Sequence, residues 1–432
     1  MKRILFMTVA VAVVFLGCEA GVISLDQESE YQDILRDSEF DYSTVVPVQL
    51  NVEVDLTDTT LGNAIGAALA TVQVTDSEDG LLFAASAENG QMVSGEILIP
   101  ARPGAVTLSI HAPGFEPYEV TIENPYQYEQ LARLIRLTAD PTAEPESDRD
   151  GDGIIDLYDA YPDDPDIAFV REVPAGAPLT IAFEDNFPEL GDGDYNDFVA
   201  TYQITEYRSA RNNLVKIRGI ADALARGAGF DHEFGMVVSF DGLNARGNIL
   251  RYNHQNELLE NVPLSGDGYV RIPIFPSTKQ AAFDRGADGV RMDNVKPEAN
   301  PSTGYSTRFT IIYESISVNS NAAQIWEPYD PYLLVRNTDH NLDLDVHLIG
   351  KDPLPDSQNH LYPGEIPAGF RDANGYPRAL LVPGDWQWPV EQIEGDPKIE
   401  TAYPNFERWT ATLGASDSDW YHYPVFGEVM VR

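Results

Sequence analysis

The sequence predicts an all-β protein in which an acidic linker joins two β-sandwiches of unequal size. Three observations favour this class. Val48, Leu50, Val52, Val54 and Leu56 alternate with polar residues, and this period of two is typical of a half-buried strand. The chain contains 33 Gly and 30 Pro, which favour frequent turns. No helical period of apolar residues persists for long.

The composition excludes several classes of protein. The 432 residues include 28 Lys and Arg against 69 Asp and Glu, so the formal net charge is −41. A protein this acidic is a poor candidate for binding nucleic acid phosphates. Hydrophobic residues make up 43% of the chain, which is enough to build a core and excludes a disordered acidic chain. A single Cys excludes a disulfide framework and a zinc site that needs two thiolates.

The N-terminus has the pattern of a secretory signal peptide. Lys2 and Arg3 precede an apolar run that ends at Leu16, which is too short to span a bilayer comfortably. Cys18 follows, at a position that resembles the lipidated cysteine of bacterial lipoproteins. Phe15 stands where such signals usually have Leu.

Cleavage before Cys18 would remove a signal peptide of residues 1–17 and leave residues 18–44 as an acidic tether. Acyl chains such as palmitate on Cys18 would anchor the protein to a membrane, since several chains together bind stably. We expect an envelope protein of a Gram-negative-type bacterium, located at the outer membrane. The alternative is ordinary signal cleavage nearby, with Cys18 removed or unmodified.

Residues 45–140 are predicted to form the first β-sandwich. Short strand patterns separated by turn signals are typical of this architecture. The pattern resembles immunoglobulin-like and carboxypeptidase-regulatory-like modules and implies no ligand. Residues 131–137 fit either a helix or a strand. Further strands are expected at residues 70–75, 81–85, 95–99, 106–111 and 118–122.

Residues 167–432 are predicted to form a larger, jelly-roll-like β-sandwich, because strand patterns alternate with Pro and Gly throughout. Residues 221–226 and 406–413 are each expected to form a short helix. Strands are expected at residues 179–183, 198–204, 214–220, 234–240, 269–275, 308–315, 332–335 and 342–349.

The linker of residues 141–166 contains a candidate calcium loop. Its acids have the spacing of an EF-hand loop, in which alternate carboxylates converge and a glycine at the sixth position permits a sharp bend. Gly153 occupies that position. The alternative is a solvated acidic linker. The candidate ligands are Asp148, Asp150, Asp152, the backbone carbonyl of Ile154, Asp156 and Asp159.

A second acidic loop follows a predicted strand and precedes another. Asp192, Asp194 and Asn196 alternate, so in an extended segment they share one face. Carboxylate and amide oxygens suit calcium better than zinc. The alternative is a polar hairpin loop. The candidate ligands are Glu184, Asp185, Asp192, Asp194, Asn196 and Asp197.

A family resemblance arises from this second loop. Residues 182–188 (AFEDNFP) and 191–199 (GDGDYNDFV) resemble the signature of LruC-domain proteins, which are bacterial secreted or lipid-anchored proteins. The upstream acidic loop resembles a thrombospondin type 3 repeat, which that family often carries. The resemblance covers roughly residues 147–425, with Gly193 and a longer step before Asp192 as departures. It implies a calcium-binding surface protein of undefined activity.

Other arrangements of reactive residues have simpler explanations. Asp343, Asp345 and His347 share one face of a predicted strand and could bind a metal, but we expect this face to be solvated. Glu184 with Asp197 is the best pair for an acid-catalysed hydrolase, but calcium binding explains both carboxylates. Four tryptophans could stack on sugars or lie in a core; they are Trp386, Trp388, Trp409 and Trp420.

These observations predict a calcium-binding, lipid-anchored envelope protein with a structural, adhesive or ligand-binding role and no catalysis. Its partners would be the membrane, through Cys18, and a carbohydrate or protein ligand, with no nucleic acid. The alternative function is a carbohydrate-active hydrolase that uses carboxylates of residues 184–197.

Overall fold

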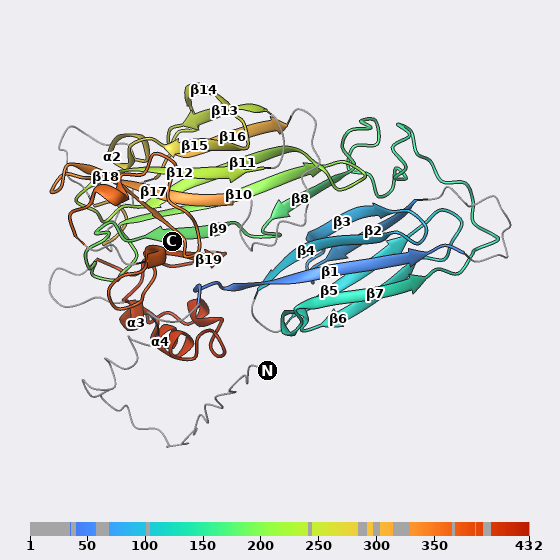
Figure 1. Cartoon of the computed structure of the whole chain (residues 1–432), viewed down its shortest axis with the longest axis horizontal. Coiled ribbons are helices and arrows are strands. Elements are labelled where there is room, and N and C mark those ends of the chain that lie inside the picture. The colour runs from blue at the N-terminus through green and yellow to red at the C-terminus, as the bar shows by residue number, and fades with distance from the viewer. Residues whose placement is uncertain are drawn as a thin grey trace, which may run out of the picture.

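The computed structural model confirms the all-β class. The described residues form mostly β-strands, with a few short helices (Figure 1). Cys18, the predicted signal peptide and most of the predicted tether lie outside them. No described helix has the length and hydropathy needed to cross a membrane. The structure describes Leu35 and residues 40–57, 69–100, 104–240, 244–283, 292–296, 303–313, 329–364, 368–384, 386–391 and 399–431.

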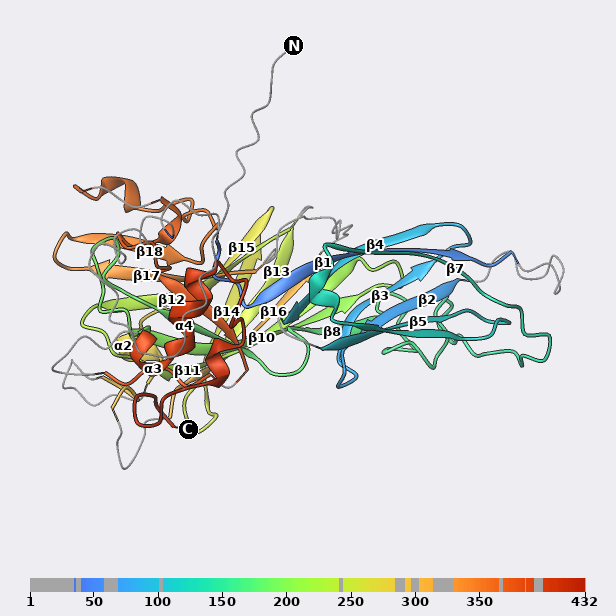
Figure 2. The same cartoon turned by 90° about the horizontal axis from the view of Figure 1, so that it is seen from below.

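Two sheets form the first folded region. The three-stranded sheet has the order β4-β1-β7 and the four-stranded sheet the order β3-β2-β5-β6. Figure 2 shows them as two layers, and apolar side chains of both, such as Val48 and Val72, share one core. The strands are β1 (Val45–Asp55), β2 (Ala70–Thr75), β3 (Leu81–Ala87), β4 (Met92–Pro100), β5 (Ala105–His111), β6 (Tyr118–Glu123) and β7 (Gln130–Arg136).

The alternation that predicted the first strand is confirmed. Val48, Leu50, Val52 and Val54 are buried on one face of β1, and β1 pairs antiparallel with β4 and parallel with β7. Residues 131–137 therefore contribute a strand to the sheet. A 3-10 helix, η2 (Pro125–Gln127), precedes this strand.

The second region contains an eight-stranded sheet of order β14-β13-β16-β11-β10-β9-β19, with β8 beside β10, and a four-stranded sheet of order β15-β12-β17-β18. Side chains of both sheets, such as Ile217 and Phe234, share one core. The strands are β8 (Phe169–Val173), β9 (Leu179–Phe183), β10 (Phe198–Arg208), β11 (Leu214–Ala225), β12 (Asp231–Ser239), β13 (Ala245–Tyr252), β14 (Leu258–Gly266), β15 (Tyr269–Phe275), β16 (Ser306–Tyr313), β17 (Tyr329–Asn337), β18 (Leu342–His347) and β19 (Ala379–Pro383).

The helices of this region are short. They are α2 (Thr278–Ala281), α3 (Ile399–Ala402), α4 (Pro404–Ala411), η3 (Asn359–Leu361), η4 (Ala368–Phe370) and η5 (Trp420–His422). The expected helix near residues 406–413 corresponds to α4. The helix expected at residues 221–226 is wrong, because residues 221–225 continue β11 and pair with β10, and the first two of them also pair with β16. Sheet pairing here overrides the helix propensity of alanine. The immunoglobulin-like and jelly-roll-like topologies and the domain boundaries stay predictions.

An aromatic cluster covers one end of the second region. Trp386, Trp388, Trp409 and Trp420 are 0–3% exposed and pack with one another and with neighbouring aromatic side chains. The ring centroids of Trp409 and Trp420 lie 5.7 Å apart. A sugar-stacking surface built from these four side chains is therefore excluded, because they have no exposed ring face.

The N-terminal segment also packs on this cluster. The ring of Phe40 lies 5.1 Å from that of Trp409, and the hydroxyl of Tyr42 donates a hydrogen bond to the carbonyl of Gly375 (2.9 Å). The guanidinium of Arg371 donates to the carbonyl of Phe40. Phe40 and Tyr42, at the end of the predicted tether of residues 18–44, thus contact the second folded region.

We expect Trp409→Ala to reduce the free energy of unfolding by about 3–5 kcal/mol, because truncation leaves a cavity in the aromatic cluster. Guanidinium unfolding followed by circular dichroism measures this loss. Phe426→Ala is the matched control, since Phe426 lies in the same C-terminal region and is 94% exposed; it should change stability by less than about 0.5 kcal/mol. Equal effects of the two substitutions would contradict the described packing.

Candidate metal centres

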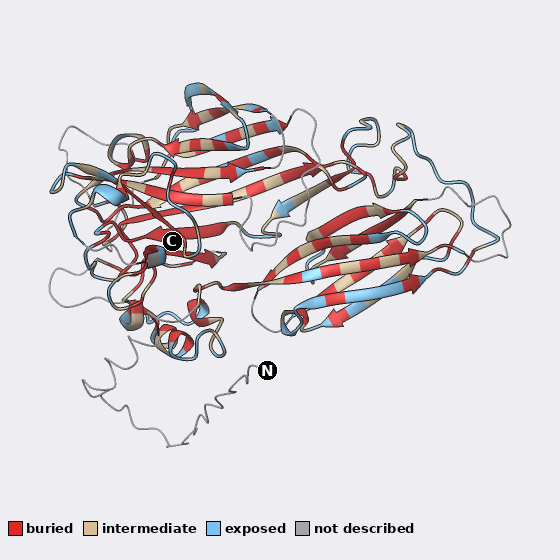
Figure 3. Ribbon diagram, viewed as in Figure 1, coloured by how far each residue is buried: buried red, intermediate tan, exposed pale blue. Residues whose placement is uncertain are grey.

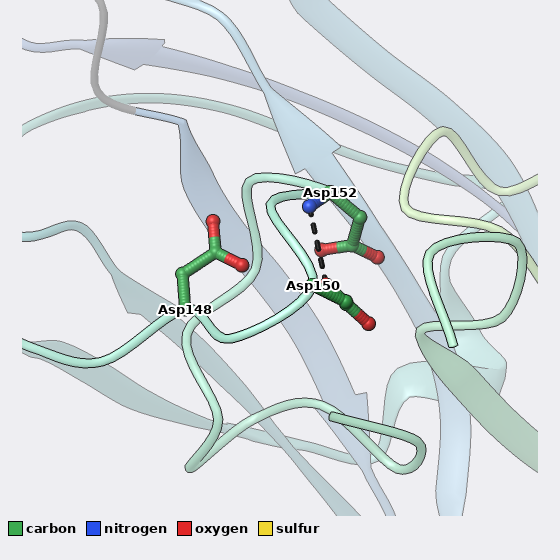
Figure 4. Close-up of side chains that lie close together, drawn as sticks. All are labelled: Asp148, Asp150 and Asp152. Carbon is green, nitrogen blue, oxygen red and sulfur yellow. Dashed lines mark hydrogen bonds between the residues drawn. The ribbon is translucent and has the colours of Figure 1, made fainter. Parts of the chain in front are cut away.

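The first acidic loop curls around its own carboxylates. The carboxylate of Asp148 accepts hydrogen bonds from the backbone amides of Gly151 (2.8 Å) and Gly153 (3.1 Å). Gly153 has a φ of 96°, a conformation that favours glycine. One carboxylate oxygen each of Asp148, Asp150 and Asp152 lies within 4.8 Å of the others, as Figure 4 illustrates. The structure thus brings these three predicted ligands together.

Three carboxylate oxygens of this loop are buried without a hydrogen-bond partner among the described residues. They belong to Asp150, Asp152 and Asp159, and in each case it is the Oδ2 atom. The other oxygen of each accepts a backbone hydrogen bond, for example that of Asp159 from Tyr161 (2.7 Å). Buried unpaired carboxylate oxygens are costly. Such oxygens are the ligands that hard divalent cations prefer, so this donor set fits calcium.

The electrostatics of the loop support the same conclusion. Burial and neighbouring carboxylates, among them Asp152 and Asp150, raise the pKa of Asp159 to about 6. Burial and next the charges of Asp150 and Asp148 also raise the pKa of Asp152, although a hydrogen bond from Ile154 opposes them. The carboxylates therefore destabilise one another in their charged form, and a bound cation would relieve this repulsion.

Asp156 behaves differently from the other predicted ligands. Its carboxylate accepts hydrogen bonds from the backbone amide of Arg149 (3.0 Å) and from the guanidinium of the same residue (3.1 Å). The structure therefore gives Asp156 a partner within the loop. Ile154 is 1% exposed, and the role of its carbonyl as a ligand stays a prediction.

The loop lies at the junction of the two folded regions. The side chains of Ile154 and Tyr158 pack in a small cluster with Ala84 of β3, Phe169 of β8 and Ala210. The conformation of the acidic loop and the contact between the first and second regions thus depend on the same apolar packing.

Polar contacts strengthen the same junction. The backbone amide of Ser86 donates to the carbonyl of Ala210 (3.0 Å), and Arg171 of β8 donates to the carbonyl of Leu82 in β3 (2.9 Å). Arg171 also pairs with Glu206 of β10. Burial alone would raise the pKa of Glu206, but the pairing with Arg171 lowers it. The buried carboxylate therefore keeps its charge.

The second acidic loop brings together three of its six predicted ligands. Carboxylate oxygens of Glu184, Asp192 and Asp194 lie within 4.8 Å of one another. Glu184 follows β9, and its carboxylate accepts hydrogen bonds from the backbone amides of Tyr195 (2.6 Å) and Gly193 (3.3 Å). This closes the loop before β10 begins.

A glycine makes room for this arrangement. A Cβ atom at Gly191 would lie only 2.1 Å from Oε2 of Glu184 and 3.3 Å from the guanidinium of Arg378. Any larger residue would displace the Glu184 carboxylate. The glycine in the sequence motif thus has a steric explanation.

Asn196 adds an amide next to this group. Its side-chain nitrogen donates to the carboxylate of Asp194, while its oxygen is buried without a partner among the described residues. Asn196 is therefore placed beside the cluster.

Two predicted ligands point elsewhere. The carboxylate of Asp185 lies 2.9 Å from the imidazole Nε2 of His232, and the carboxylate of Asp197 accepts a hydrogen bond from the backbone amide of Asp185 (2.7 Å). His232 in turn contacts the hydroxyl of Thr278 (3.2 Å). The structure does not place Asp185 or Asp197 in the group of Glu184, Asp192 and Asp194, and their role as ligands stays a prediction.

The carboxylates of the second loop also repel one another. Burial and the charge of Asp192 raise the pKa of Glu184 to about 7. Burial, Glu184 and Asp192 raise the pKa of Asp194 to about 10. Glu391 is a further acid at this site, since burial and next the charge of Asp192 raise its pKa, against a hydrogen bond from Asn196. A divalent cation would offset these effects.

Sequence reasoning missed Glu391, Arg378 and His232. Each lies far along the chain from the motif, and none belongs to a recognisable local pattern. Arg378 is 1% exposed and partly offsets the burial of Glu184, whose pKa it lowers. Only the sheet pairing of β19 with β9 brings Arg378 to this place.

A buried triad replaces the expected solvated face of β18. His347 is fully buried, with Nδ1 2.9 Å from the carboxylate of Asp330 and Nε2 3.1 Å from that of Asp345. The prediction that Asp345 and His347 are solvated is wrong, because β17 and nearby residues cover them. The backbone amide of Leu354 donates to Asp345 (2.9 Å) and the side chain of Asn359 donates to its carbonyl (2.9 Å).

Comparisons with known proteins give a family match over part of the chain. A family model described as "Domain of unknown function (DUF4842)" matches residues 212–421, a little under half of the 432 residues. This match names no activity. The curated proteins include no match to this chain. The resemblance to LruC-domain proteins stays a prediction.

Solved structures show only distant similarity. A candidate lipoprotein from Bacteroides ovatus matches with 13% identity over 90% of this chain and 99% of that chain, at a TM-score of 0.46. The Bacillus anthracis TIE protein matches with 8% identity over 53% of this chain and 43% of that chain, at a TM-score of 0.16. Carbohydrate-binding modules of the β-sandwich superfamily match with 8% identity over 63% and 94%, at a TM-score of 0.12. These scores are too low to support any inference about function.

We expect the buried triad to make stability depend on pH. Burial alone would lower the pKa of His347, but hydrogen bonds to Asp330 and Asp345 outweigh it and raise the pKa above the usual 6.5. The stabilisation that protonated His347 provides is therefore complete below pH 6.5. It is lost as the pH rises through the higher pKa that His347 has in the folded state. Urea unfolding between pH 5 and 9 measures the trend.

His347→Gln should flatten this part of the pH profile. His340→Gln is the control, because His340 is partly exposed and pairs with Glu189 at the surface. If His347→Gln left the slope between pH 6 and 9 unchanged, the proposed charge on His347 would be disproved.

Proposed function

We propose that this protein is a calcium-binding, lipid-anchored protein of the cell envelope, with a structural, adhesive or ligand-binding role and no catalysis. The observation that carries the proposal is the set of three carboxylate oxygens in the first acidic loop that are buried and have no hydrogen-bond partner among the described residues. Calcium accepts six to eight oxygen ligands in irregular geometry. The acidic loop provides several such oxygens where the two folded regions meet.

Calcium bound in this loop would stabilise the junction between the regions. A cation that binds only the folded state adds its binding free energy to folding, by about 4 kcal/mol at a thousandfold excess over the dissociation constant. Ile154 and Tyr158 pack against Ala84 and Phe169. An ion that orders the loop would therefore also stabilise this packing. The ion would then fix the spacing between the two regions.

The second loop would hold a further ion between Glu184, Asp192 and Asp194. Asn196 contacts Asp194, and the charge of Glu391 acts on the same carboxylates, so both residues are candidates for further oxygen ligands. This ion would tie the connection between β9 and β10 to the segment that carries Glu391.

The same geometry argues against the hydrolase alternative. A catalytic acid must contact its substrate, whereas Glu184 is 2% exposed and accepts two backbone hydrogen bonds. Asp197 is buried as well and accepts a backbone hydrogen bond from Asp185. These contacts support a structural role for both carboxylates.

The envelope location rests on the sequence. Cys18 follows a signal-peptide pattern at the position of a lipidated cysteine. We propose that acyl chains on Cys18 anchor the protein to the outer membrane, with a carbohydrate or protein as its ligand.

We expect Asp150→Ala/Asp152→Ala to remove one calcium site, because both side chains lose a buried oxygen. Isothermal titration calorimetry with calcium measures the number of sites and the heat of binding. The control is Asp163→Ala/Asp166→Ala, which removes the same charge at two exposed positions of the same segment. The metal hypothesis for this loop fails if calcium gives neither heat nor a rise in melting temperature.

Asp194→Asn tests the second loop separately. Asparagine nearly preserves the volume but removes a charged ligand, so we expect the calcium-induced rise in melting temperature to shrink while the melting temperature in EDTA changes little. Differential scanning calorimetry with and without calcium measures both values. Asp267→Asn, at an exposed position between β14 and β15, is the control. An unchanged calcium response in Asp194→Asn would show that this loop binds no ion.

A further inference from the structure

The outward face of the eight-stranded sheet carries a cluster of basic side chains. Along β11, β16 and β13, every second residue is exposed or half-buried while the residues between are mostly buried (Figure 3). We call this surface the basic sheet face. It comprises Lys216, Arg218, Ile220, Asp222, Ser306, Arg308, Thr310, Ile312, Arg246, Asn248, Leu250 and Tyr252.

The charge of this face is opposite to that of the protein. Four of its side chains are basic and one, that of Asp222, is acidic. The whole chain has 28 basic and 69 acidic residues. This face is therefore locally positive on a strongly acidic molecule.

Three of these cations have no carboxylate partner among the described residues. They lie on aromatic rings instead: Lys216 Nζ is 3.9 Å from the ring centre of Tyr207, and the guanidinium of Arg308 is 4.4 Å from that of Tyr252. The guanidinium of Arg218 lies 5.4 Å from the ring centre of Tyr207. Elsewhere in the molecule, arginines such as Arg271 form ion pairs. These ring contacts hold the three cations in place and leave their charges available.

The close approach of two cations is unfavourable in the free protein. Burial and the neighbouring Arg218 lower the pKa of Lys216, and the opposing effect of Asp164 is smaller. A bound anion would remove this repulsion.

The cations are spread over a flat surface. Lys216 and Arg218 are two residues apart on β11, which places their backbones about 7 Å apart. Arg308 lies opposite Ile220 on the neighbouring strand β16, about 8 Å from Arg218 by strand spacing. This span exceeds one small anion and suits repeated negative charges along an extended polymer.

Hydrogen-bonding groups lie between the cations. Thr310 is opposite Arg218 in the pairing of β11 with β16, and Asn248 is opposite Thr310 in the pairing of β13 with β16. Both side chains are half-buried. Hydroxyl and amide groups beside cations suit sugar hydroxyls next to acidic groups.

We propose that the basic sheet face binds an acidic polysaccharide. Charge complementarity selects a polyanion, and the polar residues among the cations favour sugar over lipid. A bilayer-binding surface would instead combine basic residues with many protruding apolar side chains. On this face, Ile220 and Ile312 are the exposed apolar residues.

The test compares dextran sulfate with neutral dextran as probes, using residues 19–432. This version keeps every residue that the structure describes. We expect dextran sulfate to bind and neutral dextran not to bind, with affinity falling as salt increases. Lys216→Gln/Arg218→Gln/Arg308→Gln should weaken binding about tenfold or more. Biolayer interferometry with immobilised polymer measures the affinities.

A matched variant controls for net charge. Arg133→Gln/Arg136→Gln/Arg408→Gln removes three exposed arginines outside this face and should bind dextran sulfate like the unaltered protein. Equal binding by both triple variants would overturn the proposal. It would also be overturned if phosphatidylglycerol vesicles, but not dextran sulfate, bound in a manner that depends on Lys216, Arg218 and Arg308. The calcium titration should be the same in both triple variants, so failure here is distinguishable from failure of the proposed calcium sites.

Discussion

Repulsion between buried carboxylates is the constraint on which this structure depends. The protein resolves that repulsion with its own cations where they are available. Glu206, for example, pairs with Arg171 and Arg208. In the first acidic loop and beside Glu184, several carboxylates instead face one another. These two places lie at the junction of the folded regions and at the connection between β9 and β10.

The basic sheet face also affects how the protein would meet a charged ligand. Both acidic loops lie outside the strands, while Lys216, Arg218 and Arg308, which have no carboxylate partner among the described residues, lie on the open face of the eight-stranded sheet. The acidic loops would repel an acidic polymer, while this face would attract it. The strong net charge would therefore increase selectivity for one binding orientation.

Local sequence patterns predicted both acidic loops and most of the strands, but no strand was expected at β8, β13, β14 or β19. The alternation from Val48 to Leu56 identified β1, because a strand with one buried face alternates apolar and polar residues along its own sequence. The spacing of Asp148, Asp150 and Asp152 likewise reflects the curl of a single loop.

Features that depend on distant residues could not be predicted in this way. Residues 221–225 have the composition of a helix, yet pairing with two neighbouring strands extends them as β11. His347 has the alternation of an exposed strand position and is nevertheless buried between Asp330 and Asp345. Glu391 meets Asp192 only because the fold returns the chain to the same place.

The docking of the N-terminal segment on the aromatic cluster determines how mechanical load would enter the protein. The chain contacts Trp409 and Arg371 before it enters β1, so an anchor at Cys18 would connect first to the C-terminal end of the second region. A pulling force from the membrane would act on this aromatic contact and spare the first pair of sheets. The order of the two regions away from the bilayer would then be the reverse of their order in the sequence.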